Sequence, residues 1–325
     1  MQNIKLLINS LVSIFITIVS INFFVINSES EFQIITLLNV IISGWYYLFC
    51  ACLLLLISVY LRSYRWKYLF DSNVELKLSF LFKSQLIGYF TNNILPIRVG
   101  DVIRSYVVAK NTNNKTSYVI GTIAMERFLD TVTILFFSLI IFWHYGTDYL
   151  EIKYNFTSIP FILCFLLAPI LGYLFYNLIL KFSFPIKINQ IINNIWRGFS
   201  AIQFKHKRAI IFYSIIIWVI YCMNVFLIQL IFIQFELSIF DCLLILVASS
   251  FLQMIPVGFG AFGVFHLGVQ GVLNKLGVQG YQNFIILLHL YSLVMYTVSG
   301  GYFFFSEKTL NIKKLYNELI ANQSS

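Results

Sequence analysis

The sequence predicts an all-α integral membrane protein, in which six transmembrane helices and two re-entrant helical hairpins form an inverted repeat. Three observations lead to this fold class. Hydrophobic residues make up 59% of the 325 positions and charged residues only 11%, far below the roughly 25% of a soluble domain. Apolar stretches of membrane-spanning length recur along the chain. Two further apolar stretches are interrupted by proline and glycine.

Six apolar stretches of about 20 residues are each long enough to cross a hydrocarbon core of roughly 30 Å as a helix. They are Ile4–Ile26, Val40–Leu61, Tyr118–Trp143, Ile159–Leu180, Ala209–Ile233 and Phe284–Phe305. The first is too long for a secretory signal peptide and lacks a small-residue cleavage site, so we expect it to be retained. No stretch between the spans is long or polar enough for a separate soluble domain, and we expect residues 1–325 to form one membrane domain.

Basic residues are concentrated in alternate loops, which predicts the orientation of the chain. All but three of the 22 lysines and arginines lie at the start of the first span, as Lys5 does, or in the loops after the second, fourth and sixth spans. The exceptions are Lys153, Lys275 and Arg127. Because basic loops stay on the cytoplasmic side, both termini should be cytoplasmic in a multi-pass protein of the plasma or inner membrane. This distribution accounts for the net charge of +9 without nucleic acid as a partner.

Cofactor and metal chemistry are not expected. The five cysteines lie in or beside apolar segments, so neither a disulfide framework nor a metal site is indicated. The stretch GFGAFG, residues 258–263, fits the dinucleotide pattern G-x-G-x-x-G. That pattern needs a βαβ unit and an acidic residue about 20 positions further on, whereas no acidic residue occurs between Asp241 and Glu307. These glycines are better explained by a sharp turn and a close backbone approach.

Two apolar segments, approximately residues 78–110 and 238–276, are interrupted near their middle. Pro96 and Pro256 each remove a helical hydrogen bond and clash with the preceding turn, so neither segment is one straight helix. Backbone groups freed in this way are tolerated at membrane depth where protein or a water-filled cavity surrounds them. We therefore expect a re-entrant helix, break, helix hairpin in each place.

The two breaks match each other in sequence. The stretch ILPIRVGD aligns with MIPVGFGA, so that Pro96 matches Pro256 and Gly100 matches Gly260 at the same offset of 160 residues. This offset also places the third span on the sixth and, more loosely, the first two spans on the fourth and fifth. Since each half has three spans, the halves would cross the membrane in opposite directions, as in the inverted repeats of many transporters. The halves are approximately residues 1–150 and 151–325.

Six ionisable residues lie at the first break and in the third span, within otherwise apolar sequence. A charge at the bilayer centre costs at least about 2.5 kcal/mol, so such residues usually face a bundle interior and mark a pathway. Glu126 and Asp130 are four residues apart and share a helical face, while the adjacent Arg127 points elsewhere. Asp101 and Arg104 are three apart and can also share a face. The six residues are Arg98, Asp101, Arg104, Glu126, Arg127 and Asp130.

This group of charges has two interpretations. In the first, the charges are only structural: three arginines and three carboxylates form a neutral ion-pair network that holds the hairpin against the third span. A variant of this interpretation places Arg98 and Arg104 at the membrane surface and lets Asp101 cap a helix. In the second, Arg98 and Arg104 bind a phosphate or carboxylate from the cytoplasmic leaflet, because a guanidinium can pair with two oxygens at once. Both can hold if an anionic head group displaces one acidic partner and so couples binding to movement.

Other polar residues have simpler interpretations. His266 is in the second hairpin, where a hydrogen-bonded structural role is the simplest interpretation and proton coupling is the alternative. His289 belongs to no constellation in the sequence. Arg62, Arg65 and Lys67 alternate with aromatic residues and are interpreted as an interfacial anchor on anionic lipid.

Three stretches resemble, in their order and spacing, the transmembrane family of lysylphosphatidylglycerol synthases, also called the flippase-like family. They are NNILPIRVGDVIRSYVV, GTIAMERFLDTVTILFF and QMIPVGFGAFGVFHLGVQGVLNKLGV. The likeness covers nearly the whole chain. It departs from many members at His266, where they carry a glutamate. The matching positions are Asn93, Pro96, Arg98, Gly100, Asp101 and Arg104; Glu126, Arg127 and Asp130; and Pro256, Gly258, Gly260 and Gly263.

The resemblance implies a lipid flippase or transporter rather than an enzyme. An anionic phospholipid or a polyprenyl-phosphate-linked head group would bind to the six charged residues at a midplane site between the two hairpins, with no cofactor. The residues expected to shape this site are Asn93, Pro96, Gly100, Pro256, Gly258, Gly260 and Gly263. Family members are fused to aminoacyl-lipid synthases or occur beside glycosyltransferases, so a lipid-modifying enzyme or glycosyltransferase is an expected partner. The rival hypothesis is an integral membrane glycosyltransferase, or its accessory subunit, acting on a polyprenyl-phosphate-linked sugar with Glu126 or Asp101 as a base or metal ligand.

Overall fold

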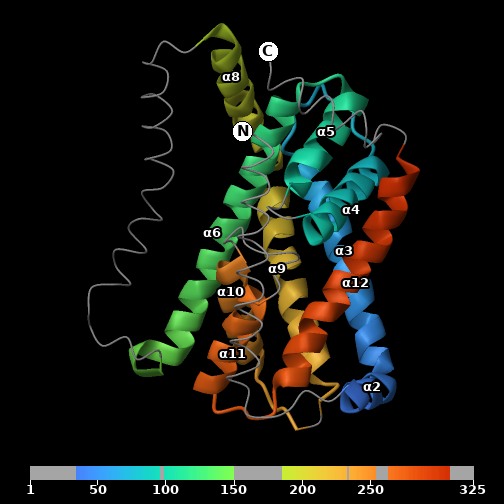
Figure 1. Ribbon diagram of the computed structural model, residues 1–325. Helices are drawn as coiled ribbons and strands as arrows, with labels where there is room; N and C mark the ends of the chain where they lie inside the picture. The colour runs from blue at the N-terminus through green and yellow to red at the C-terminus, as the bar shows by residue number, and fades with distance from the viewer. Residues whose placement is uncertain (1–33, 96–98, 150–184, 233, 254–262, 308–325) are drawn as a thin grey trace.

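The computed structural model describes residues 34–95, 99–149, 185–232, 234–253 and 263–307, and these residues form an all-helical bundle without a strand (Figure 1). Four helical stretches in this part of the chain are long and apolar enough to cross a membrane. They are residues 45–67, 116–146, 186–229 and 282–306. An all-helical, multi-pass membrane protein is therefore confirmed, while the number of six spans stays a prediction.

Long apolar helices alternate with pairs of shorter helices along the chain. The first half of the molecule contains α2 (Ile34–Ser43), α3 (Trp45–Lys67), α4 (Leu78–Ile94), α5 (Gly100–Thr112) and α6 (Thr116–Tyr149). The second half contains α8 (Ile186–Ser200), the short 3₁₀ helix η2 (Phe204–His206), α9 (Lys207–Gln229), α10 (Ile239–Gln253), α11 (Val264–Lys275) and α12 (Gln282–Ser306).

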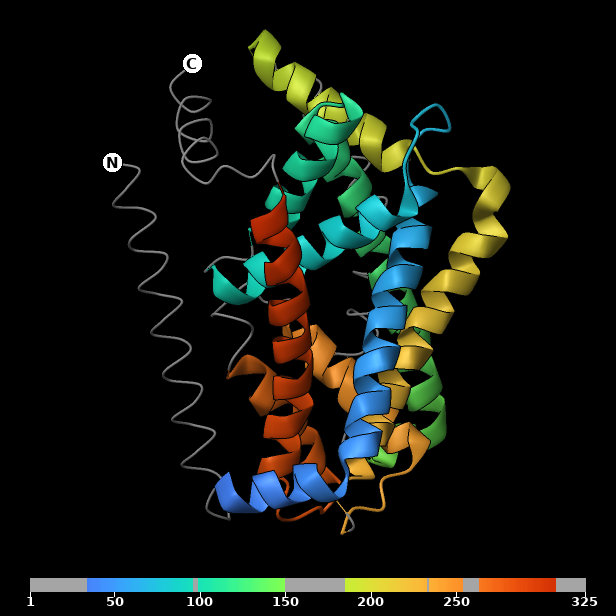
Figure 2. The same cartoon turned by 90° about the vertical axis from the view of Figure 1, so that its right-hand side faces the viewer.

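The two interrupted segments each form a helix, break, helix unit, as the sequence predicts. The first unit, α4 and α5, lies between α3 and α6 in the chain, and the second, α10 and α11, lies between α9 and α12. In Figures 1 and 2 the first unit lies in the upper half of the bundle and the second unit in the lower half. The two units therefore occupy different halves of the bundle.

The second predicted span is shifted along the chain. We expected Val40–Leu61, whereas α2 ends before Gly44 and α3 continues to Lys67. The helix continues past Leu61 because Arg62 and Arg65 are buried, with 5% and 0% of their surfaces exposed. The interpretation of Arg62 and Arg65 as an anchor at the membrane surface is therefore wrong.

The other predicted spans divide into two groups. Tyr118–Trp143 lies within α6 and Phe284–Phe305 within α12, while most of Ala209–Ile233 lies within α9. The spans Ile4–Ile26 and Ile159–Leu180 lie outside the described residues. So do five residues at the two breaks that were predicted to belong to the site, namely Pro96, Arg98, Pro256, Gly258 and Gly260.

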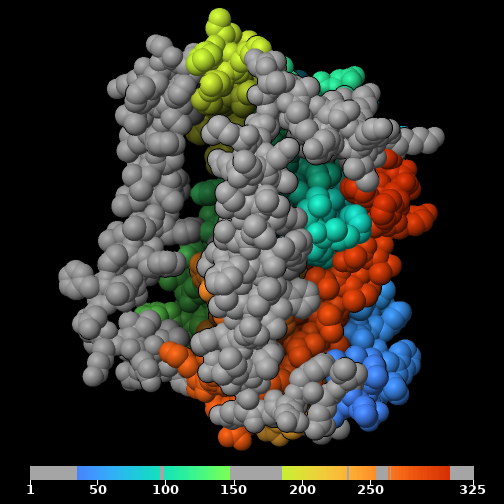
Figure 3. All heavy atoms as spheres, viewed as in Figure 1, coloured from blue at the N-terminus to red at the C-terminus, as the bar shows by residue number. Residues whose placement is uncertain are grey.

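Helices from the two halves pack against each other along the bundle. The helix α3 lies along α9, and α4 crosses α12; Figure 3 shows α4 and α12 in contact at one side of the molecule. Tyr89 of α4 stacks on Tyr296 of α12, with ring centroids 4.4 Å apart. A large apolar cluster joins α6, α9, α10, α11 and α12. Because the halves interleave, the middle of the bundle is bounded by helices from both.

Candidate functional site

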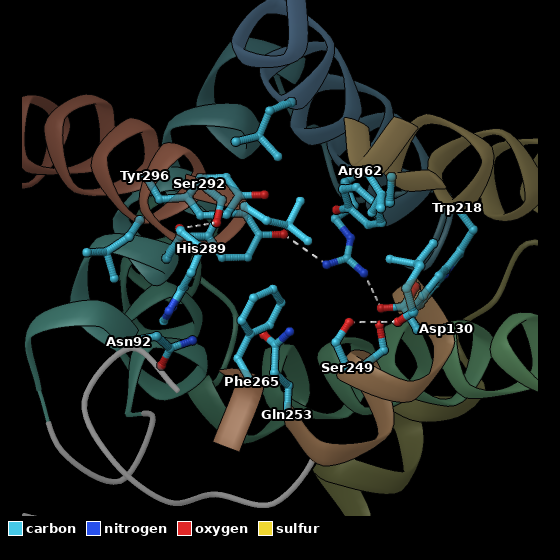
Figure 4. A pocket seen from close by; sticks show the side chains of 18 of the residues that line it. Arg62, Asn92, Asp130, Trp218, Ser249, Gln253, Phe265, His289, Ser292 and Tyr296 are labelled. Carbon is cyan, nitrogen blue, oxygen red and sulfur yellow. Dashed lines mark hydrogen bonds and ion pairs between the residues drawn. The ribbon is translucent and has the colours of Figure 1, made fainter. Parts of the chain in front are cut away.

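A cavity of about 570 Å³ lies between α3–α6 of the first half and α9–α12 of the second half (Figure 4). Its charged wall comes from α3, α5 and α6, and contains Arg62, Asp101, Arg127 and Asp130. Three of these four residues belong to the charged group that the sequence singled out. Arg62 does not, and its position here is the first sign that the cluster extends further than the sequence suggested.

Asp130 is buried in α6 between two arginines of α3. Its carboxylate accepts a very short hydrogen bond from Arg62 and a bond of 2.7 Å from Nη2 of Arg65. Arg65 also donates to Oγ of Ser214 at 3.0 Å, and Arg62 donates to the hydroxyl of Tyr89 at 2.9 Å. Charges this deeply buried are stable only when they are paired and hydrogen-bonded, so this arrangement holds α3, α4, α6 and α9 in fixed positions.

Glu126 lies one helical turn before Asp130 and is fully buried, with 0% of its surface exposed. Its Oε2 lies 3.3 Å from Nη1 of Arg104 and accepts a hydrogen bond of 3.2 Å from Nε2 of Gln85. Its Oε1 lies 3.7 Å from Nε of Arg62. Since Arg62 contacts both carboxylates, the predicted shared face of Glu126 and Asp130 is confirmed.

Arg104 is buried in α5, with 1% of its surface exposed, and so does not lie at a membrane surface. Its guanidinium lies 4.9 Å from the ring centre of Trp66, close enough for a cation–π contact. It also donates a short hydrogen bond to Oε1 of Gln85. Asp101 and Arg104 share a face of α5 as predicted, with 2.9 Å between Oδ1 and Nη2.

Asp101 and Arg127 form the accessible part of the cluster. Nη2 of Arg127 donates to Oδ1 of Asp101 at 3.0 Å, and Nε donates to Oδ2 at 3.3 Å. Their side chains are 35% and 44% exposed. Two expectations are corrected. Asp101 does not cap α5, because the N-cap residue is Val99, which makes no side-chain hydrogen bond there. Arg127 does not point away from the acidic face of α6, because its Nη1 lies 3.8 Å from Oδ2 of Asp130. The long arginine side chain reaches around its own helix to both carboxylates.

The cluster of described charges is not neutral. It contains four guanidinium groups against three carboxylates, whereas three of each were expected. Each carboxylate contacts at least two arginines, and one positive charge remains in excess beside the cavity. Its members are Arg62, Arg65, Arg104, Arg127, Asp101, Glu126 and Asp130. An excess positive charge in a low-dielectric cluster beside a cavity attracts an anion more than a cation.

Sequence reasoning missed Arg62 and Arg65, although a signal for them existed. They are three residues apart, which places both on one face of a helix, and they follow directly on an apolar stretch. Their partner Asp130 lies 65 positions after Arg65 in the chain. No spacing along one helix connects residues so far apart, so the pairing follows only from the packing of α3 on α6.

The remaining polar wall of the cavity is neutral. Asn93 and Gln253 lie at the ends of α4 and α10, and both line the cavity. They are 160 residues apart, the same offset that aligns Pro96 with Pro256. Nδ2 of Asn93 donates to Oγ1 of Thr297 at 3.1 Å, which ties α4 to α12. Figure 4 shows Gln253, Ser249, Ser292 and His289 around the same space. The cavity is therefore charged on the side of α3, α5 and α6 and neutral elsewhere.

Two of the glycines that the sequence singled out shape the breaks. A side chain at Gly100 would place its Cβ 2.0 Å from the backbone oxygen of Gly88, so only glycine lets α5 approach α4 this closely. The Gly100 N–H donates to Oδ1 of Asn92 at 2.7 Å. Gly263 has a φ of 85°, a left-handed conformation that side chains disfavour. It starts α11, and its N–H donates to Nδ1 of His266 at 3.3 Å.

His266 is buried behind the cavity wall, with 5% of its surface exposed. Its hydrogen bond with Gly263 gives it a structural role at the start of α11, and proton coupling stays a prediction. The ring of His289 lies 5.1 Å from that of His266 and lines the cavity. The expectation that His289 belongs to no constellation is therefore wrong, because α11 and α12 bring the two histidines together.

Within the described part of the chain, no group of three or more His, Cys, Asp or Glu residues is placed to hold a metal ion. No curated protein and no solved structure matches the chain. The family model described as the lysylphosphatidylglycerol synthase TM region matches residues 8–300, which include both breaks and the whole charged cluster. The chain therefore belongs to the lysylphosphatidylglycerol synthase TM region family.

Proposed function

We propose that this protein moves a lipid with an anionic head group between the leaflets of the membrane, and that the head group binds in the cavity between the two units. The observation that carries the proposal is a cavity bounded by both units, with the accessible Arg127 in its lining. The described charged cluster beside this cavity has four arginines and three carboxylates. Membership of the family is consistent with a lipid-related role in the membrane. In this proposal the two units are re-entrant hairpins of an inverted repeat, and both termini are cytoplasmic.

The cluster supports a division of labour between a fixed part and an exchangeable part. Arg65, Arg104 and Glu126 are almost fully buried, and breaking their pairs would leave an uncompensated charge. Asp101 and Arg127 are accessible, so an anion can replace Asp101 as the partner of Arg127 at a lower cost. A guanidinium binds two oxygens of a phosphate as readily as it binds the two oxygens of a carboxylate. This exchange of partners would therefore loosen α5 from α6 when the head group binds. Loosening of the first unit is our proposed link between binding and movement.

The test is leaflet exchange of fluorescent phosphatidylglycerol in liposomes that contain the full chain. Arg127→Gln removes the accessible guanidinium, and we expect exchange to fall about tenfold or more, since a hydrogen bond to a charged group is worth roughly 1.5–3 kcal/mol. The matched control is Arg197→Gln, which changes an exposed arginine at the end of α8, outside the cavity lining. Equal exchange by both variants and the unchanged protein would remove the binding role.

The transferase hypothesis makes a different demand on the same residues. A general base needs a carboxylate that can take a proton from the substrate. Glu126 is instead held between Arg62 and Arg104, and Asp101 between Arg104 and Arg127. We therefore propose transport without catalysis. Incubation of the purified protein with a nucleotide sugar and a polyprenyl phosphate separates the two, because turnover without leaflet exchange would support the transferase.

A lipid-modifying enzyme or glycosyltransferase that supplies the lipid is the partner we propose. Such an enzyme would act on the head group at one leaflet, after which this protein would move the product. Mass spectrometry of lipids and proteins that purify with the chain in mild detergent tests this proposal. A glycerophospholipid or polyprenyl lipid retained by the unchanged protein and lost in Arg127→Gln would identify the substrate and indicate its source.

A further inference from the structure

The polar lining of the cavity has two chemically different parts. All charged groups in the described wall come from α3, α5 and α6, and in Figure 4 Arg62 and Asp130 lie on the opposite side of the space from Ser292 and Tyr296. The neutral part, which we call the neutral wall, comes from the ends of α4 and α10 and from α12. It consists of Asn92, Asn93, Ser249, Ser250, Gln253 and Ser292. A head group that fills the cavity meets both parts at once.

In the described wall, the charged part offers a cationic head group no carboxylate that lacks an arginine partner. An ammonium needs an acceptor with free negative charge, but Asp130 is held by Arg62 and Arg65. The other two carboxylates of the cluster are each held between two arginines as well. The described charged cluster, with four arginines and three carboxylates, instead favours a phosphodiester, which carries a single negative charge and can pair with the accessible Arg127. A positively charged aminoacyl group beside that phosphate would be repelled by the remaining guanidinium groups.

The neutral wall offers groups that both donate and accept hydrogen bonds. Amides and hydroxyls pair with the hydroxyl groups of a sugar or polyol in either direction, which a purely apolar or purely acidic wall cannot do. Tyrosine side chains also line the cavity and supply apolar faces with a polar edge.

We infer that the head group is a phosphodiester that carries a neutral, polyhydroxylated group, a sugar or another polyol, and not an aminoacylated cation. The phosphate contacts Arg127, and the hydroxyl groups contact the neutral wall. This inference rests on the proposed function, because it assigns the two parts of the cavity to two parts of one lipid. A glycerophospholipid and a polyprenyl lipid can both carry such a head group, so the chemistry is common to two sources.

Native mass spectrometry of the full chain with four lipids tests the inference. Phosphatidylinositol and a polyprenyl-phosphate hexose carry a polyol on a phosphodiester, phosphatidate lacks the polyol, and lysylphosphatidylglycerol carries the cation. We expect either polyol lipid to bind at least about tenfold tighter than the last two, as loss of one or two hydrogen bonds predicts. The better of the two polyol lipids identifies the source. Gln253→Leu should abolish this preference, while Gln190→Leu, at an exposed position of α8, should preserve it.

The outcomes separate the two proposals. Equal binding of phosphatidate and the polyol lipids, or tighter binding of lysylphosphatidylglycerol, would overturn the polyol inference while the anion site stands. A preference that survives Gln253→Leu would overturn it as well. If no anionic lipid binds and Arg127→Gln changes nothing, the proposed function itself fails. A preference lost in Gln253→Leu, together with weaker binding of every anionic lipid in Arg127→Gln, supports both.

Discussion

The two helix, break, helix units differ in how they contribute to the cavity. In the first unit, α5 carries Asp101 and Arg104, which pair with Arg127 and Glu126 of α6. In the second unit, α10 and α11 contribute no charged residue to the cavity lining within the described part of the chain; their contribution is hydroxyl, amide and aromatic groups. Ion pairs between helices are costly to break when buried, whereas neutral contacts are not. The first unit is therefore held by ion pairs to α6, and the second by packing and single hydrogen bonds such as those of Asp241 and Gln270.

The largest expected effect comes from a buried charge of the first unit. Arg104→Met leaves Glu126 with a weaker partner at 3.7 Å and Gln85 without its donor. We expect a loss of about 3–5 kcal/mol in the free energy of unfolding, because a buried carboxylate loses its pair. Thermal unfolding in detergent, followed by tryptophan fluorescence, measures it.

The matched change in the second unit is Gln270→Leu in α11, whose Nε2 donates to the Tyr281 hydroxyl at 3.3 Å. It should cost about 1 kcal/mol, the usual value for one neutral hydrogen bond. Similar losses for Arg104→Met and Gln270→Leu would mean that charge does not distinguish the two units.

Glycines provide the next comparison. Gly100→Ala places a Cβ 2.0 Å from a backbone oxygen of α4, so the first unit must open, at a cost of about 1–3 kcal/mol. Gly271→Ala in α11 meets nothing within 4 Å and should stabilise the helix by roughly 0.5–1 kcal/mol. Opposite shifts in the melting temperature of the two variants are the expected result. A neutral Gly100→Ala would show that α4 and α5 can separate freely.

A smaller effect, on binding rather than stability, is expected from Asp101→Asn. The substitution removes the accessible carboxylate and raises the excess positive charge, so an anionic lipid no longer competes for Arg127. We expect the dissociation constant for phosphatidylglycerol to fall about tenfold, which corresponds to roughly 1.4 kcal/mol of binding free energy. Leaflet exchange should be slower, because the lipid is released more slowly. Titration of the lipid against protein in nanodiscs measures the first change, and the liposome assay measures the second. Weaker binding would mean that Asp101 positions Arg127 rather than competing for it.

The smallest effect is expected at the start of α11. His266→Leu removes the acceptor for the Gly263 N–H and should cost roughly 0.5–1.5 kcal/mol in thermal unfolding. If the role of His266 is only structural, the pH dependence of leaflet exchange stays as in the unchanged protein. A shifted pH profile in His266→Leu would instead support proton coupling in the second unit.

Much of the fold could be predicted from the sequence because the signals are local. The lengths of α6, α9 and α12 follow from uninterrupted apolar stretches, and the two breaks follow from proline and glycine within apolar segments. The end of α3 could not be placed in this way. Two arginines normally end a span at the membrane surface, and here the partner that keeps them inside lies on another helix.

The site was predicted less completely than the fold. The spacing of Glu126 and Asp130 gave their shared face, and the motif at the first break pointed to Asp101 and Arg104. The sequence did not indicate that Arg127 reaches Asp101, since a contact between α6 and α5 depends on the path of a long side chain. The neutral wall gave no signal either, because serine, asparagine and glutamine in apolar helices more often serve helix packing.

By itself, the sequence determined that this chain is a helical membrane protein with two interrupted helices and a group of charges near the first interruption. Apolar length, helix-breaking residues and spacing within one helix are properties of neighbouring residues, so they can be read without a fold. The tertiary structure decided which charges meet, that arginines outnumber carboxylates in the described cluster, and that one cavity touches both units. Those features depend on how α3, α6 and α12 pack, and packing joins residues that are far apart in the chain.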